Sequence, residues 1–166
     1  MSSRGFIDRG NGMKQHWYLV AHAAGARLFA QDGIKKELRL VRRFENPQGK
    51  LKSSELVSDR QGRADRLGFS GHAALGSQGT AHMHVLESFA HELGAFLEDG
   101  AKKNSFDTLV VVAEPHFLGE LNKHIGPGAA KRQRPALQKD FAHISDHEIL
   151  EHLNAVLCYH EDVVRA

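Results

Sequence analysis

The stretch Phe106-Asp107-Thr108-Leu109-Val110-Val111-Val112-Ala113 decides the fold of this chain. Its nearly continuous run of β-branched and aliphatic residues is typical of a central strand in a parallel sheet, buried on both faces. Glu114-Pro115 ends this strand, and proline suits the first turn of a short helix that we predict through Leu118 and Leu121. Because ligands bind beyond the carboxyl ends of such strands, chemistry is expected near residue 114.

Three further strands are predicted upstream of this one. The short aromatic and apolar run Trp17–Ala21 predicts a strand buried on both faces. A second strand is predicted through 27–30, and Asp32-Gly33 is a strong signal for a hairpin turn after it. In the third strand, Leu38, Leu40 and Phe44 alternate with charged residues, which is the period of a strand with one face in solvent.

Helices are predicted from apolar residues at helical spacing. The first helix is predicted from Thr80, as N-cap, to Gly100 and carries the stripe Met83, Leu86, Phe89, Ala90, Leu93, Phe96 and Leu97. Ser145 and Glu148 form a capping-box pattern at the start of the last helix. A weaker fifth strand is expected around 134–139, after Gly126-Pro127-Gly128 breaks the preceding helix.

The predicted order is a three-stranded antiparallel meander followed by helix, strand, helix, strand and helix. This order predicts an α/β protein with a ribonuclease-H-like mixed sheet. With 166 residues, the chain has the length of one domain, which we place at 15–166. Residues 1–14 are expected to form a flexible arm, and the polar, glycine-rich segment 46–79 to form a long loop.

Composition limits the partners and the compartment. The 22 Lys and Arg residues nearly balance 20 Asp and Glu, so any contact with nucleic acid must come from a local basic patch. The single Cys158 excludes an intrachain disulfide framework, and the first residues contain no apolar run of the kind that a secretory signal requires. We therefore expect a cytoplasmic protein without a membrane span.

A nuclease of the ribonuclease-H type is disfavoured by the first strand. Such an enzyme needs several carboxylates around paired metal ions, one of them normally from that strand. Residues 16–22 contain no Asp or Glu, and Glu87 and Glu114 alone do not make a two-metal site.

Twelve histidines raise the question of a bound metal. His84, Glu87 and His91 follow the spacing i, i+3, i+7 on the polar face of the long helix, which is compatible with metal ligation. A solvated polar face is the favoured interpretation, because a zinc site needs further ligands that this spacing does not supply. We therefore expect no cofactor, and a histidine-rich metal-binding protein remains the third hypothesis.

Basic residues are concentrated in three places that could meet phosphate groups. The clusters are Arg39, Arg42 and Arg43; Arg60, Arg63 and Arg66; and Lys131, Arg132 and Arg134. Glu114 and His116, just after the central strand, are added as candidate binding residues. Ordinary surface charge is the alternative for each cluster taken alone.

Several segments together resemble the bacterial host-attachment protein family. They are Trp17-Tyr18-Leu19-Val20-Ala21 with Ala26-Arg27-Leu28-Phe29, Ser58-Asp59-Arg60-Gln61-Gly62-Arg63, Phe106 to Pro115, Phe117-Leu118-Gly119 and Lys139-Asp140-Phe141. The resemblance covers residues 15–157 and departs at His22, where many relatives are expected to have Asp. It implies a protein required for attachment to host cells. It also implies similarity to the middle domain of the archaeal and eukaryotic class-one peptide chain release factor.

That release-factor domain carries a Gly-Gly-Gln loop before its long helix, which helps water attack peptidyl-tRNA. Here Gly76-Ser77-Gln78 occupies the similar place, with Ser77 instead of the second glycine. A glutamine and its backbone amide can orient a water and stabilise an oxyanion without a titrating base. The resemblance thus implies Gln78, with Gly76 and Ser77, as a catalytic candidate.

Two hypotheses of function lead from these observations. The first is a cytoplasmic binding module that acts on attachment indirectly, through the ribosome or tRNA. The alternative is an enzyme, a peptidyl-tRNA or ester hydrolase that uses Gln78. We expect a binding protein rather than an enzyme, and the sequence leaves the oligomeric state and the ligand open.

Overall fold

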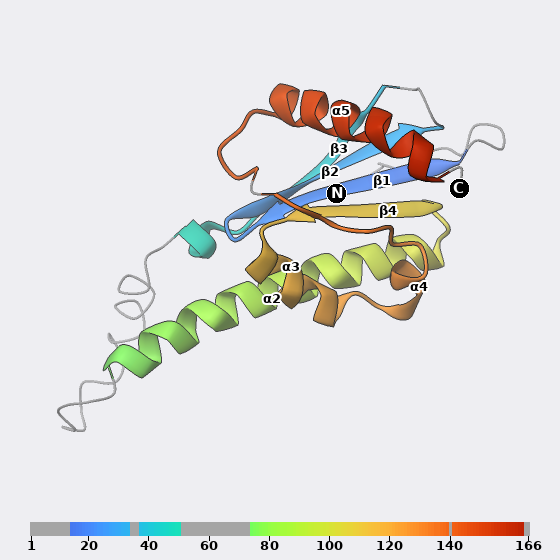
Figure 1. The fold of residues 1–166 in the computed structure, drawn as a ribbon. Helices are drawn as coiled ribbons and strands as arrows, with labels where there is room; N and C mark the ends of the chain where they lie inside the picture. Colours follow the sequence, from blue (N-terminus) through green and yellow to red (C-terminus); the bar gives the residue numbers. More distant parts are fainter. Residues whose placement is uncertain (1–13, 34–36, 51–73, 140, 165–166) are drawn as a thin grey trace, which may run out of the picture.

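The computed structural model describes residues 14–33, 37–50, 74–139 and 141–164, with the backbone alone described for 74–78 and 156–164. Within these residues the chain forms a mixed five-stranded sheet with four α-helices, as the α/β prediction required (Figure 1). The strands are β1 (Gln15–His22), β2 (Gly25–Asp32), β3 (Arg39–Glu45), β4 (Thr108–Ala113) and β5 (Leu137–Gln138). The helices are α2 (Ala74–Lys102), α3 (Pro115–His124), α4 (Pro127–Ala130) and α5 (Asp146–Val164), with a 3₁₀ helix, η1 (Pro47–Lys50).

The strand order in the sheet is β3-β2-β1-β4-β5. β1 pairs antiparallel with β2 and parallel with β4, and β2 pairs antiparallel with β3, so the predicted meander is confirmed. Gly33 follows β2 with φ 82°, a left-handed conformation that glycine adopts without a steric penalty. The glycine at the predicted turn Asp32-Gly33 is therefore explained by the left-handed backbone that the chain adopts there.

Each face of the sheet has its own apolar core. Trp17, Leu19, Leu109 and Val111 pack against α2 and α3 on one face, whereas Tyr18, Val20 and Val112 pack with Ile149 and Leu153 of α5 on the other. Figure 1 shows α2, α3 and α4 on one side of the sheet and α5 on the opposite side. The two central strands are therefore covered on both faces, as their apolar sequences predict.

The long helix begins earlier than predicted. It starts at Ala74 rather than at Thr80, so the supposed N-cap lies inside the helix and residues 74–79, predicted as loop, are helical. A glycine inside a helix costs only about 1 kcal/mol relative to alanine, and no proline lies between 74 and 102 to stop the helix. The amino-terminal part of α2 extends beyond the sheet (Figure 1), and Met83, expected in the core, is 43% exposed.

The other boundaries agree more closely with the sequence. The capping box is confirmed: the Glu148 N–H donates to Ser145 Oγ at 3.3 Å, and the Ser145 N–H donates to Glu148 Oε2 at 2.7 Å. The Ser145 N–H and the Ser145 hydroxyl both donate to the Glu148 carboxylate, and these two bonds lower the pKa of that carboxyl below its ordinary value. The sequence did not predict α4, which follows Gly126 and whose Ala129 N–H donates to Glu98 Oε2 at 2.9 Å.

Two predicted segments lie outside the described residues: the arm, except for Lys14, and the part of the loop at 51–73. No helix in the described ranges combines the length and apolar character needed to cross a membrane.

The two ends of α2 offer a test of this packing. Leu97→Ala removes a fully buried side chain of the α2 core and is expected to lower the free energy of unfolding by about 2–5 kcal/mol. Met83→Ala, on the extended part of the same helix, is expected to change it by less than about 0.5 kcal/mol. Urea denaturation followed by circular dichroism measures both, and equal losses would contradict the described position of α2.

Candidate functional site

A polar hollow lies beside the turn between β1 and β2, against the start of β2 and the end of β3. The hollow has a volume of about 240 Å³. It is lined by His22, Ala24, Gly25, Ala26, Arg27, Arg43, Phe44, Glu45, Lys50 and Ala142. Three of these residues are cationic and only Glu45 is anionic, so the hollow favours an anion.

Arg27 serves mainly to hold the wall of the hollow together. Its side chain is 13% exposed and donates to the backbone carbonyl oxygens of Ile144 and Phe141, each at 2.9 Å, and to Asp146 Oδ1 at 3.0 Å. Asp146 also pairs with the exposed Arg43. One carboxylate thus faces two guanidinium groups, which leaves an excess of positive charge at the rim.

The predicted cluster Arg39, Arg42 and Arg43 lies on β3, at the edge of the sheet, and all three side chains are exposed. The Arg42 guanidinium stands over the rings of Phe44 and Phe96, 4.9 and 5.0 Å from their centroids. Arg39 pairs with Asp32 at 3.3 Å, but both side chains are largely in solvent, where such a pair contributes little. These arginines therefore remain able to bind an anionic partner.

The cluster at Lys131, Arg132 and Arg134 does not join this surface. Gln133 pairs with Leu109 near the amino end of β4, whereas the hollow lies at the carboxyl end of β1. Arg132 is turned inward, where it donates to the Phe106 carbonyl oxygen and, at 2.7 Å, to Asn104 Oδ1. Arg132 is thus a structural contact, while Lys131 and Arg134 are exposed.

The remaining predicted binding residues are not gathered at the hollow. Glu114 is half-buried at the N-cap position of α3 and accepts the Leu118 N–H through its backbone carbonyl at 2.9 Å. His116 is exposed in the first turn of α3. Neither lines the hollow. Arg60, Arg63 and Arg66 lie outside the described residues.

The catalytic hypothesis required Gly76, Ser77 and Gln78 in a loop before the long helix. Their backbone is instead part of α2, which begins at Ala74. Residues this close to a helix start lack the irregular backbone that a glycine-rich catalytic loop supplies. The loop prediction was wrong at this point, because isolated glycines and polar residues do not stop a helix.

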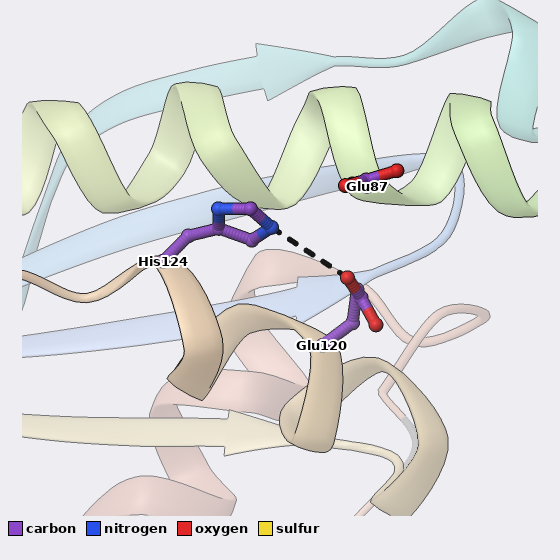
Figure 2. A group of neighbouring side chains, drawn as sticks. All are labelled: Glu87, Glu120 and His124. Atoms are coloured by element: carbon purple, nitrogen blue, oxygen red, sulfur yellow. Dashed lines mark ion pairs between the residues drawn. The ribbon is translucent and has the colours of Figure 1, made fainter.

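A second group of polar side chains lies where α3 crosses α2. Glu87 of α2 and Glu120 and His124 of α3 each bring one ligand atom to within 4.8 Å of the others (Figure 2). Two carboxylates and one imidazole are donors that divalent transition metals accept. We call these three residues the interhelical group.

Electrostatics within the interhelical group stabilises the ionised carboxylate of Glu120. The Lys123 ammonium donates to Glu120 Oε2 at 2.7 Å, and His124 Nε2 lies 3.5 Å from Glu120 Oε1. The hydrogen bond from Lys123, followed by the contribution of His124, lowers the pKa of the Glu120 carboxyl below its ordinary value. Glu120 is therefore a carboxylate at neutral pH.

The predicted metal set His84, Glu87 and His91 is only partly gathered. His84 and Glu87 lie on exposed helix surface with Nδ1 and Oε2 3.6 Å apart, whereas His91 contacts the ring of His124 edge-on at a centroid distance of 5.6 Å. Sequence reasoning missed Glu120 and His124. Their i, i+4 spacing was visible in the sequence, but which helix would face them was not.

Comparison with known proteins places the chain in a family. Residues 17–153 match the family described as protein required for attachment to host cells, and the chain belongs to that family. This confirms the resemblance found in the sequence. No curated protein matches the sequence.

Among solved structures, the chain is similar to one titled archaeal protein and to an archaeal translation termination factor. Each is 10% identical in sequence with a TM-score of 0.43. The similarity covers 91% of this chain but 40% and 41% of those chains, so this chain spans about two fifths of their length.

The pH dependence of stability tests the Glu120 contacts. A carboxyl whose pKa is lowered by folding stabilises the protein above its unfolded pKa, and this contribution is lost as the pH falls through the folded value. Glu120→Gln is therefore expected to lower the free energy of unfolding at pH 7, with a difference from wild type that shrinks as the pH falls below 4.5. Urea titrations from pH 7 to pH 3 measure this difference.

The exposed Glu92 on α2 supplies the control, since Glu92→Gln is expected to leave the pH profile unchanged. A loss in Glu120→Gln that stays constant across the whole pH range would show that packing, rather than charge, causes it.

Proposed function

We propose that this host-attachment family protein is a binding module for RNA. It would bind the backbone phosphates of the ribosome or of tRNA. The observation that carries this proposal is the concentration of three exposed arginines, Arg39, Arg42 and Arg43, on the edge strand β3. Its effect on attachment is then indirect, through translation or expression of surface structures.

The chemistry of arginine supports this choice of ligand. A guanidinium presents several N–H donors in a planar fork that matches the oxygens of a phosphate, and it remains charged at any physiological pH. Arg42 is held over two aromatic rings, so less side-chain freedom is lost when it binds. Arg42 lies over Phe96 of α2, whereas Arg43 pairs with Asp146 of α5, so these arginines present donors on both faces of the edge strand.

The hollow extends the same surface. Arg43 belongs both to the edge strand and to the lining of the hollow, where Lys50 adds a further cation. A phosphate or a carboxylate seated there would meet the positive charge that Asp146 leaves uncompensated.

A hydrolase that uses Gln78 is not favoured over binding. The helical backbone at 76–78 removes the loop that this mechanism needs. Binding by the exposed arginines of β3, which we call the basic edge, needs no catalytic group.

We also propose a cytoplasmic location. One cysteine in 166 residues allows no intrachain disulfide, which suits a reducing compartment. Stable display of the protein on the outer cell surface, detected by labelling intact cells, would contradict this location and the indirect role.

The ribonuclease-H-like assignment of the sheet is likewise a proposal. It is supported by the strand order β3-β2-β1-β4-β5, with β2 alone running against its neighbours. A crystal structure with a different order would overturn it.

The basic edge predicts salt-dependent binding to RNA. Co-sedimentation with bacterial ribosomes and anisotropy of labelled tRNA, each across a salt series, should show affinity that falls as salt rises. Replacing Arg39, Arg42 and Arg43 together by Gln is expected to weaken binding and to reduce the slope of log affinity against log salt by about 2, if each contacts one phosphate.

The matched control replaces Lys102, Lys131 and Arg134 by Gln, three exposed cations away from β3. It removes the same charge and is expected to retain most of the affinity. Equal weakening by both triple variants would reduce the effect to net charge, and absence of binding at low salt would refute an RNA partner.

A further inference from the structure

We propose that Glu87, Glu120 and His124 form a binding site for a divalent transition-metal ion, with Zn²⁺ as the ion tested, where α3 crosses α2. This inference does not depend on RNA binding, because it concerns other residues and a cationic ligand instead of an anionic one.

The donors suit such an ion in kind and in number. Zinc accepts imidazole nitrogen and carboxylate oxygen, and three protein ligands leave one position for water or a further ligand. Bond lengths near 2.0–2.1 Å place the ligand atoms of a tetrahedral ion about 3.4 Å apart. Since the three atoms already lie within 4.8 Å of one another, side-chain movements of about 1 Å would close the site.

The fold holds two of the three donors in place. Gly94 of α2 lies against the backbone of His124, and a Cβ there would collide with the carbonyl oxygen of that residue. The missing side chain therefore lets the end of α3 touch α2. As a result, Glu120 is 8% exposed and its carboxylate faces Glu87 across the helix contact (Figure 2).

Two of the donor atoms converge on one point. Glu120 Oε1 faces His124 Nε2 at 3.5 Å, while the other carboxylate oxygen, Oε2, accepts the hydrogen bond from Lys123. The Glu87 side chain is 54% exposed and forms the open rim through which an ion can enter. His91, one turn further along α2, adds a second imidazole beside His124.

Lys123 is the competitor that makes this proposal testable. Its ammonium occupies one oxygen of Glu120, and its positive charge opposes a cation at the other. Its side chain is 68% exposed and can move into solvent. If the three residues form a metal site, removal of Lys123 strengthens ion binding. If they form only an ion-pair network, the ion binds neither the wild type nor the Lys123 variant.

The experiment titrates the full chain with Zn²⁺ at pH 7.5, by calorimetry and by competition with a fluorescent chelator. Loss of a residue that merely supports a metal ligand commonly costs 10- to 100-fold in affinity, so loss of a ligand should cost at least about tenfold. Glu87→Gln and His124→Gln are expected to show that loss, and Lys123→Met a gain. Zn²⁺ should also raise the melting temperature of the wild type and not that of His124→Gln.

Controls separate this site from the other histidines. His147, on the exposed face of α5, is replaced by Gln and should retain wild-type affinity. Glu87→Gln changes an exposed side chain and keeps the test valid if substitutions at the buried Glu120 prevent folding. Unchanged affinity in Glu87→Gln and His124→Gln, or no gain in Lys123→Met, would overturn the proposal.

Discussion

Burial of β1 and β4 on both of their faces is the constraint on which the rest of the structure depends. Leu19 and Val20 are adjacent in sequence, point to opposite faces, and are both inaccessible to solvent. A sheet of this kind is stable only if helices cover both sides, because each exposed apolar face would lose the free energy of burial. The long α2 with α3 covers one side, and α5 covers the other. Arg27 donates hydrogen bonds to the backbone of the segment that precedes α5 and so holds it against the sheet.

The same packing decides where polar groups remain available. Because the helices cover the two faces, the edge strand β3 is where arginines can line the sheet without being buried. On the α2 side, the close approach at Gly94 brings two helices near enough for acidic and imidazole side chains to share one place. The two candidate surfaces thus follow from one arrangement of layers and differ in chemistry: one offers cations to a ligand, and the other offers carboxylate and imidazole groups.

Charge compensation shows how each surface is balanced in the absence of a partner. Asp146 pairs with Arg27 and Arg43 at the hollow, and Lys123 pairs with Glu120 between the helices. In each case one partner is more buried and structural, while the other is exposed and free to be displaced. A bound ligand would therefore replace the ion pair of Arg43 with Asp146, or that of Lys123 with Glu120, by a contact to the ligand.

The sequence by itself determined the strands, the order of the meander, the capping box at Ser145 and the family, since these depend on local periodicity, local hydrogen bonding and motif order. It did not determine the start of α2, because neither glycine nor Thr80 forces a helix to begin. Only the tertiary structure decided that Arg132 turns inward and that Glu87 meets Glu120 and His124 rather than acting with His84 and His91. Such pairs are set by which helix faces lie against each other. Packing between residues far apart in the chain determines which faces meet. The spacing of residues along one helix does not predict this packing.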